Sequence, residues 1–183
     1  MGEAARRIDV LDTAPRFTAA DAEALNARFA GVATREMLAE VLDQGLAGRV
    51  ASVSSFGAES AVLLHLIASV DPAVPVLFLE TGKHFAETLA YRDELVARLG
   101  LTNLINLIPD PEVLAARDGN GLRWSFDPDG CCEIRKVAPL ARALAGFDAS
   151  FTGRKGFQSA TRAGLARFEI YTTDSAGRLK INP

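Results

Sequence analysis

Val50-Ala51-Ser52-Val53-Ser54-Ser55-Phe56-Gly57-Ala58-Glu59-Ser60 is the stretch of sequence that decides the fold. Its first four residues predict a short buried strand, and apolar residues at helical spacing predict a helix over 58–70. Small and hydroxyl-bearing residues join the two. A strand that runs through such a loop into a helix is typical of a parallel α/β sheet, in which ligands bind beyond the carboxyl ends of the strands.

The same alternation continues outward from this stretch. Strands are predicted at 74–79, 103–108 and 149–153, helices at 85–99 and 133–145, and a hairpin at 168–173 and 178–181 that turns at Ser175-Ala176-Gly177. Gly100 is a suitable residue to end the helix before it. Residues 109–130 are predicted to be a long loop that carries the only tryptophan, Trp124. The predicted class is α/β, with a mostly parallel sheet flanked by helices.

Residues 1–48 precede the first strand and predict a helical cover. Apolar residues at helical spacing fall at 21–30 and 34–46, and Thr34 is a plausible cap for the second helix. We expect 1–48 to belong to the same domain as 49–183, because 183 residues that are 49% hydrophobic can bury a substantial common core.

Composition excludes several classes of partner. The net charge of −3 gives no overall attraction to nucleic acid or to an anionic membrane. No apolar run approaches the length that crosses a bilayer, and the first residues lack the apolar stretch of a secretory signal. We therefore expect a cytoplasmic protein with no nucleic-acid or membrane partner.

Cys131 and Cys132 are the only cysteines, and they run directly into Glu133-Ile134-Arg135-Lys136. Their Cα atoms are about 3.8 Å apart, below the roughly 4.4–6.8 Å that a disulfide spans, so a structural staple is not expected. Cations nearby favour thiolates, and paired cysteines are usual ligands of iron–sulfur clusters and zinc. Two thiolates are half of such a site, and two reduced thiols without a metal remain the alternative.

Three segments follow predicted strands and are candidate anion sites. The loop 54–60 offers hydroxyls, backbone N–H groups and a helix N-terminus, although it lacks the Walker A pattern. Residues 79–84 could present backbone groups and one cation to a nucleotide, or simply turn the chain. Residues 152–162 contain Arg154 and Arg162 in a run of cations without a carboxylate until Glu169. Arginine forks bind phosphate or sulfate, and a solvated basic face is the alternative.

Four motifs in order carry a family resemblance: SSFGAES (54–60), LETGKHFAETLAYRDEL (79–95), CCEIRKVAPL (131–140) and TGRKGFQSATRA (152–163), with KINP at the end. From about residue 50 onward the sequence resembles the assimilatory adenylyl-sulfate reductases, relatives of the 3′-phosphoadenylyl-sulfate reductases. The resemblance implies a fold similar to the adenine-nucleotide α-hydrolase (PP-loop) type.

The resemblance also implies roles for individual residues. The modified phosphate loop would comprise Ser55, Phe56, Gly57, Ala58, Glu59 and Ser60. The adenosine segment would contain Leu79, Thr81, Gly82 and Lys83, and the arginine loop would add Gly153, Gln158 and Ser159. Lys136, Arg154 and Arg162 would act as catalytic cations. Cys131 and Cys132 would ligate a 4Fe-4S cluster.

The implied activity is thiol-dependent reduction of adenylyl sulfate to sulfite and AMP in assimilatory sulfate reduction, which serves cysteine biosynthesis. The implied reductant is thioredoxin or a glutaredoxin-like dithiol, and homo-oligomerisation is left open. Alternatives are a reductase of the 3′-phosphorylated substrate, a non-catalytic adenine-nucleotide-binding fragment, and an ATP-pyrophosphatase-type adenylating enzyme. The last normally carries a SGGxDS loop, which Phe56 and Ala58 interrupt here.

One departure from the family pattern affects the expected activity. The family takes two further cluster ligands from a downstream C-x-x-C and its nucleophilic cysteine from a C-terminal tail, whereas this sequence ends at Ile181-Asn182-Pro183. We therefore expect 49–183 to be a nucleotide-binding reductase domain without its tail, its attacking thiol and two of four cluster ligands. Such a domain should bind nucleotide better than it turns it over.

Overall fold

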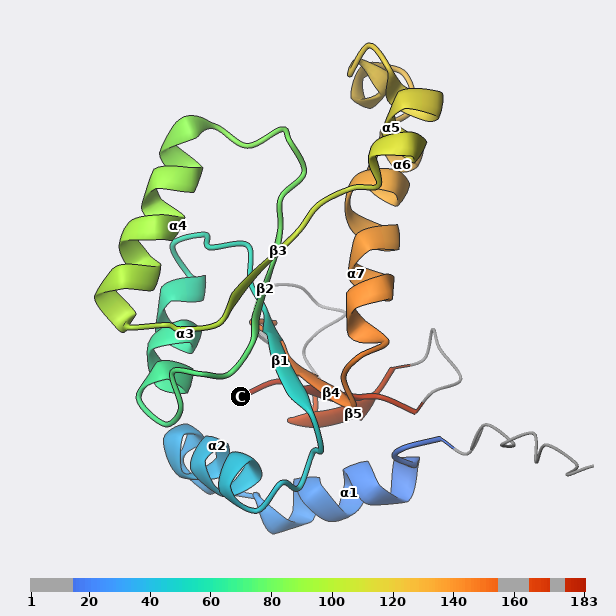
Figure 1. Cartoon of the computed structure of the whole chain (residues 1–183). Helices are drawn as coiled ribbons and strands as arrows, with labels where there is room; N and C mark the ends of the chain where they lie inside the picture. The colour runs from blue at the N-terminus through green and yellow to red at the C-terminus, as the bar shows by residue number, and fades with distance from the viewer. Residues whose placement is uncertain (1–14, 155–164, 172–176) are drawn as a thin grey trace, which may run out of the picture.

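A computed structural model describes residues 15–154, 165–171 and 177–183 (Figure 1). Its strands are β1 (Val50–Val53), β2 (Val76–Leu79), β3 (Leu104–Leu107), β4 (Ala149–Phe151), β5 (Phe168–Ile170) and β6 (Leu179–Ile181). In the described residues they form one six-stranded sheet of order β3-β2-β1-β4-β6-β5. Only β5 and β6 pair antiparallel, and the other neighbours are parallel. The predicted α/β class with a mostly parallel sheet is confirmed.

Helices lie on both faces of the sheet. The helices α3 (Ser60–Ala68) and α4 (Ala86–Leu99) cover one face, and α7 (Ala138–Leu144) covers the other (Figure 1). Side chains of β2 alternate between these faces, because Phe78 packs in the cluster with α3 and α4 while Leu77 packs with Leu144 of α7. No helix in the described ranges has the length and apolar character needed to cross a bilayer.

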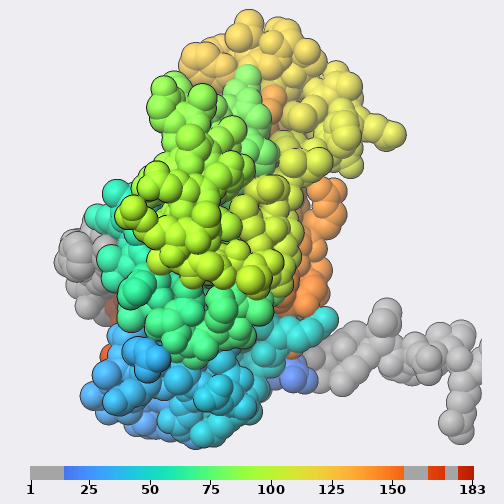
Figure 2. Space-filling view, turned by 60° about the vertical axis from the view of Figure 1, so that its left-hand side comes forward, coloured from blue at the N-terminus to red at the C-terminus, as the bar shows by residue number. Residues whose placement is uncertain are grey.

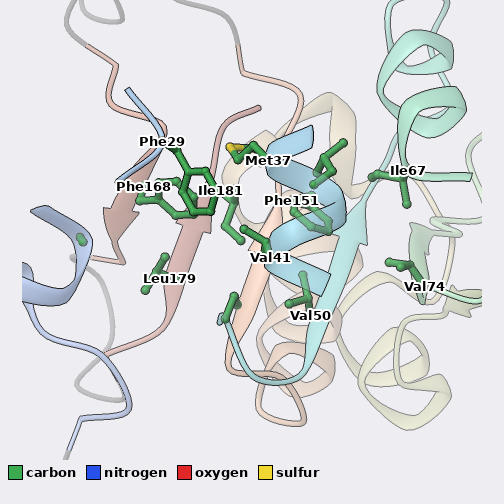
Figure 3. Close-up of a cluster of buried hydrophobic side chains, with 14 residues drawn as sticks. Phe29, Met37, Val41, Val50, Ile67, Val74, Phe151, Phe168, Leu179 and Ile181 are labelled. Atoms are coloured by element: carbon green, nitrogen blue, oxygen red, sulfur yellow. The ribbon is translucent and has the colours of Figure 1, made fainter. Parts of the chain in front are cut away.

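The largest core cluster joins the N-terminal helices to the sheet. The helices α1 (Ala19–Arg28) and α2 (Thr34–Asp43) precede β1. Phe29, at the end of α1, stacks on Phe168 of β5 with ring centroids 5.6 Å apart, and Met37 of α2 lies in the same cluster (Figure 3). All three side chains are fully buried. The proposed division into a cover of residues 1–48 and a reductase domain of 49–183 stays a prediction.

The order of the strands places a crevice between β1 and β4. These two strands are parallel neighbours, yet the chain leaves β1 for β2 on one side, whereas β4 has β6 on its other side. The loops beyond their carboxyl ends therefore diverge. In open α/β sheets this switch point is where ligands bind.

The prediction that 109–130 is a loop was wrong. The segment holds α5 (Pro111–Asp118), a 3₁₀ turn η1 (Arg123–Ser125) and the start of α6 (Pro128–Cys132). Asp110 and Asp127 cap the two α-helices, each accepting a backbone N–H hydrogen bond of 2.9 Å, from Glu112 and Gly130 respectively. Proline in the first turn suits a helix start, because its missing N–H would be unpaired there in any case.

Other helix boundaries also differ from the prediction. The helix predicted over 133–145 begins five residues earlier as α6, and continues through a π-helical turn η2 (Glu133–Val137) into α7. Thr34 is the first residue of α2 and not its cap, because Ala33 occupies the capping position. Thr18 instead caps α1. Gly100 ends α4 with a left-handed φ of 66°, as predicted. The predicted hairpin turn lies mostly outside the described residues.

Candidate functional site

A first cavity lies at the switch point between β1 and β4. We call it the loop cavity; its volume is about 470 Å³, and it is lined by Val53, Ser55, Gly57, Ala58, Glu59, Ser60, Gly153 and Arg154. The structure thus brings together two segments that the sequence separates by almost a hundred positions. Because α3 begins at Ser60, the N-terminus of this helix lies beside the cavity, and its partial positive charge favours an anion.

Phe56 anchors the loop from the opposite side. Its φ of +53° is left-handed, which is uncommon for a side chain of this size. The ring is fully buried and meets Phe78 edge to face, with centroids 5.6 Å apart, and the Phe56 N–H donates to Ser54 Oγ. The core therefore holds Phe56, while its neighbours Ser55 and Gly57 line the cavity. Phe56 thus shapes the loop, and its predicted role in binding stays a prediction.

Arg154 reaches the loop cavity from the end of β4 and is held by a polar network. Its Nη2 pairs with the Glu169 carboxylate and donates to Asn182 Oδ1 at 3.2 Å. The buried Asn182 side chain also donates to Glu169 at 3.2 Å and accepts from Thr152 Oγ1 at 2.6 Å. Arg154 Nε is buried without a hydrogen-bond partner in the described part of the chain. Arg162, Gln158 and Ser159 lie outside the described residues.

A second cavity, which we call the thiol cavity, joins the other two predicted segments. Its volume is about 640 Å³, and it is lined by Thr81, Lys83, His84, Phe85, Trp124, Pro128, Cys131, Cys132, Arg135 and Lys136. The residues after β2 therefore meet the helix that carries both cysteines. Leu79 ends β2, and Gly82 adopts a left-handed φ of 68° in the turn that follows. Figure 2 shows the yellow surface of the α5 segment standing above the green surface of α4.

The helix of the thiol cavity has a buried and an exposed face. Cys131 and Arg135 are one turn apart and both buried, whereas Cys132 and Lys136 are one turn apart and both exposed. Among the described residues Lys136 has no ion-pair partner. Lys83 is engaged, because its Nζ donates to the Gly121 carbonyl at 2.6 Å. Lys136 is therefore the cation of this cavity that is left to meet a ligand.

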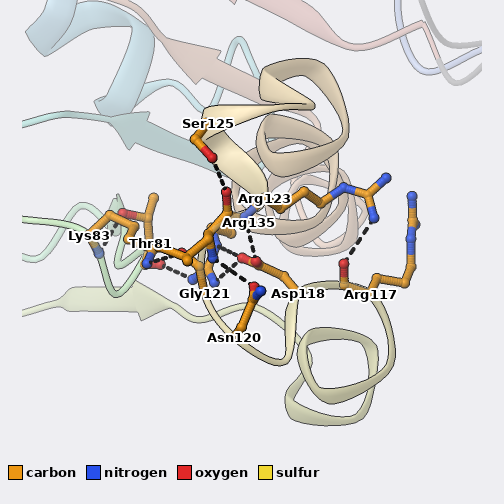
Figure 4. Close-up of polar contacts among 10 residues, drawn as sticks. Thr81, Lys83, Arg117, Asp118, Asn120, Gly121, Arg123, Ser125 and Arg135 are labelled. Carbon is orange, nitrogen blue, oxygen red and sulfur yellow. Dashed lines mark hydrogen bonds and ion pairs between the residues drawn. The ribbon is translucent and has the colours of Figure 1, made fainter.

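Sequence reasoning did not single out Arg135 and Asp118. Arg135 donates from Nη1 to the Thr81 carbonyl at 2.7 Å and from Nε to Asp118 Oδ2 at 3.1 Å (Figure 4). The pKa of the Asp118 carboxyl lies below its ordinary value, because Arg135 and then the Arg123 N–H donate hydrogen bonds to its charged form. The only local signal was the cationic pair in the segment after the cysteines, and it did not distinguish Arg135 from Lys136.

The two cysteines do not by themselves fit an iron–sulfur cluster. A 4Fe-4S cluster takes four thiolate ligands, and this sequence contains two cysteines, adjacent in one helix. One of them is buried and the other exposed, and no group of three or more metal-binding side chains occurs in the described residues. The pair can supply half of a cluster site, and further ligands would have to come from elsewhere.

Comparisons with known proteins agree on one family. A family model described as the phosphoadenosine phosphosulfate reductase domain matches residues 49–183. An adenosine 5′-phosphosulfate reductase from Mesorhizobium japonicum is 46% identical over 178 residues, which are 97% of this chain and 68% of the relative. One from Chelativorans sp. is 56% identical over 137 residues, 74% of this chain and 54% of the relative. This chain thus spans about half to two thirds of the length of these relatives.

A solved structure shares the fold. The crystal structure of phosphoadenylyl-sulfate (PAPS) reductase from Candida auris, in a phosphate complex, superposes with a TM-score of 0.69. The sequence identity is 25%, and the match covers 91% of this chain and 79% of that chain. The similarity therefore extends over most of the described sheet and its helices.

Proposed function

This chain belongs to the phosphoadenosine phosphosulfate reductase family, and from that premise we propose that it binds adenylyl sulfate for thiol-dependent reduction to sulfite and AMP. The observation that carries the proposal is the thiol cavity, where the segment after β2, Lys136 and both cysteines line one space of about 640 Å³. The relatives named adenosine 5′-phosphosulfate reductase support the choice of substrate. The pathway would be assimilatory sulfate reduction.

Binding of the nucleotide would use both cavities. In the loop cavity, the N-terminus of α3 and the Arg154 guanidinium are suited to an anionic group of the ligand. The segment after β2, with Leu79, Thr81 and Gly82, would contact adenosine, and Lys136 would face the sulfate from the thiol cavity. Arg162, Gln158 and Ser159 would complete the site from the arginine loop.

The reaction would proceed in two balanced steps. The family resemblance implies that the attacking thiolate belongs to a cysteine outside residues 1–183, because both cysteines of this sequence are assigned to the cluster. That thiolate would attack the sulfur of adenylyl sulfate, the bond from sulfur to the phosphate oxygen would break, and AMP would leave with the electron pair, so that a thiosulfonate remains on the attacking cysteine. A thioredoxin- or glutaredoxin-like dithiol then attacks that cysteine sulfur, expels sulfite, and closes to its own disulfide as it restores the thiolate. Lys136 and Arg154 would stabilise the charge that develops on the leaving phosphate oxygens.

The roles of the two cysteines are a separate part of the proposal. We assign Cys131 and Cys132 as two ligands of a 4Fe-4S cluster, so the attacking thiolate is not one of them. Because the pair does not fit a complete cluster, no step of the reaction is derived through it. The 183-residue protein purified without oxygen should contain little iron and labile sulfide, and stoichiometric 4Fe-4S in its monomer would contradict the assignment.

Titration calorimetry together with a sulfite assay tests the proposed function. Adenylyl sulfate and AMP should bind at the same single site, each displacing the other. Absence of binding to correctly folded protein would overturn the proposal. A guanosine nucleotide of equal charge is the control for non-specific attraction.

A second function, nucleotide binding without turnover, is favoured by one observation. Both cysteines of the sequence lie in one helix of the thiol cavity, and with both assigned as cluster ligands neither is left to attack the substrate. Binding of adenylyl sulfate without sulfite release in the presence of thioredoxin would select this function. Thioredoxin-dependent sulfite release by the 183-residue chain would select the reductase and would show that Cys131 or Cys132 is the nucleophile, against their assignment as cluster ligands.

A further inference from the structure

The guanidinium of Arg135 joins two segments that are far apart in the sequence. Its Nη1 donates to the Thr81 carbonyl at 2.7 Å, while Nε and Nη2 both donate to Asp118 Oδ2. The Asp118 side chain is completely buried, and its Oδ1 accepts the Arg123 N–H at 2.8 Å. Figure 4 shows Arg135 between Thr81 and Asp118. Both charges are thus removed from water, and the hydrogen bonds satisfy them.

A second contact holds the same turn from the side of Gly121. Lys83 Nζ donates to the Gly121 carbonyl at 2.6 Å, and the Lys83 N–H donates to Thr81 Oγ1 at 3.2 Å. A Cβ at Gly121, whose φ is +70°, would lie 3.1 Å from Lys83 Nζ, so glycine permits this close approach. The turn 81–83 is therefore held at two points by residues 118–135.

These contacts also fix the helix that bears the thiols. Arg135 lies one turn after Cys131 on the buried face of that helix, and the exposed face carries Cys132 and Lys136. A shift of the turn 81–83 would pull on the guanidinium through the Thr81 carbonyl. Because the guanidinium is planar and held on two sides, the helix would have to shift with it.

We propose that Arg135 is a positioning residue that couples the turn 81–83 to the thiol-bearing helix, with Asp118 as the partner that orients it. Ligand bound at the turn is then sensed at Cys131–Lys136 through Arg135 and Asp118, beyond the direct contacts that the lining of the thiol cavity allows. This inference rests on the proposed function only for the identity of the ligand, AMP. The mechanical coupling itself is a property of the fold.

Hydrogen–deuterium exchange on the full chain tests the coupling. With saturating AMP, exchange of amides in 128–137 should slow by roughly fivefold or more in the wild type, the lower end of ordinary coupling between two sites. In Arg135→Lys and Asp118→Asn the slowing should fall below about twofold, although AMP still saturates the turn. Because AMP is saturating in every sample, a lower affinity of a variant for AMP does not change the comparison with the wild type.

A matched control separates coupling from stability. Asp148 is a partly buried carboxyl paired with Arg49, and its pKa is also lowered, but it lies at the other end of β4. Asp148→Asn should lower stability and leave the effect of AMP on 128–137 unchanged. The proposal would be overturned if AMP no longer slowed exchange of 128–137 in Asp148→Asn. It would also be overturned if AMP slowed this exchange fully in both Arg135→Lys and Asp118→Asn.

Failure of the proposed function would be visible separately. If calorimetry detects no AMP binding, the exchange of 81–84 and 128–137 is compared without ligand. Coupled segments should then both exchange faster in Arg135→Lys and Asp118→Asn. Faster exchange in one segment alone would overturn the coupling. If Arg135→Lys does not fold, Lys83→Met removes the contact to the Gly121 carbonyl instead. Faster exchange in both segments would support the coupling, and faster exchange in one segment alone would overturn it.

Discussion

The loop cavity and the thiol cavity are built in different ways. Each wall of the loop cavity is a segment that directly follows a strand, 54–60 after β1 and 153–154 after β4, so the sheet order alone brings them together. The thiol cavity depends instead on Arg135, whose partners Asp118 and Thr81 are 17 and 54 positions away. Topology thus shapes the first cavity, and a buried charge network shapes the second.

This difference predicts different responses to substitution. The Arg154–Glu169 pair beside the loop cavity is about one third exposed, so solvent screens it. The Arg135–Asp118 pair beneath the thiol cavity is almost completely buried, so either residue without the other leaves a charge away from water. Loss of Arg154 should therefore impair ligand binding at the loop cavity, whereas loss of Arg135 should impair folding around the thiol cavity.

The largest effect is expected for Arg135→Met. This change leaves the Asp118 carboxylate buried without its cation, and removal of one partner of a buried pair should lower the melting temperature by roughly 6–20 °C in a domain of this size. Scanning calorimetry measures it. Arg98→Met, which removes an exposed pair with Glu94 on α4, is the control and should change the melting temperature little. An equal fall in melting temperature for Arg135→Met and Arg98→Met would show that the buried pair is no more important for folding than an exposed one.

Arg154→Ala should act on ligand binding with little effect on folding. If Arg154 binds an anionic group of the substrate, its loss should weaken AMP or adenylyl-sulfate binding by roughly 1.5–3 kcal/mol, the range for hydrogen bonds to charged groups. The same loss is expected for Arg162→Ala. Calorimetric titration beside a melting curve measures both quantities. Unchanged affinity would show that Arg154 serves only its network with Glu169 and Asn182.

The success of sequence analysis follows the same division. The strand Val50–Val53 was predicted to the residue, because a short apolar run followed by small polar residues has few other solutions. The loop after it lines a cavity, and its role as an anion site stays a prediction. The hairpin of β5 and β6 was predicted too. The sequence did not predict that β6 of this hairpin pairs with β4, because strand order depends on contacts that a local pattern does not encode.

The thiol cavity was predicted only in part. The cysteine pair, Lys136 and the turn after β2 were identified, but the helix α5 was missed because Asp110-Pro111 resembles a chain break as much as a helix cap. Without α5, Asp118 had no predicted position near Arg135. A buried ion pair leaves no periodic signal in the sequence, and its partners are recognised only when the chain is folded.

Acid should weaken the buried network of Asp118 and Arg135. The pKa of Asp118 is depressed below its ordinary value of 3.8, chiefly by Arg135, so its contribution to stability is present above that value and is lost as the pH falls through the lower folded-state pKa. Urea unfolding from pH 7 to pH 3 measures the free energy of unfolding of the wild type and of Asp118→Asn. The difference between these two free energies should be constant down to about pH 4 and smaller below it. A difference that stays constant throughout would contradict this assignment.

The smallest effect expected is the preference between two nucleotides. Arg154, the described cation of the loop cavity, is assigned to the anionic group that both nucleotides share, so an added 3′-phosphate would need a further cation. Adenylyl sulfate should therefore bind more tightly than its 3′-phosphorylated relative. Competition titration measures the ratio, and tighter binding of the 3′-phosphorylated form would reverse the choice of substrate.

The central claim is that the two cavities hold one ligand. Hydrogen–deuterium exchange of the wild-type chain saturated with adenylyl sulfate tests it most directly, because peptides that cover 54–60, 80–84 and 131–137 report on both cavities in one experiment. The account predicts slower exchange in all three segments at the same ligand concentration. Slower exchange confined to 54–60, or to the other two segments alone, would contradict it.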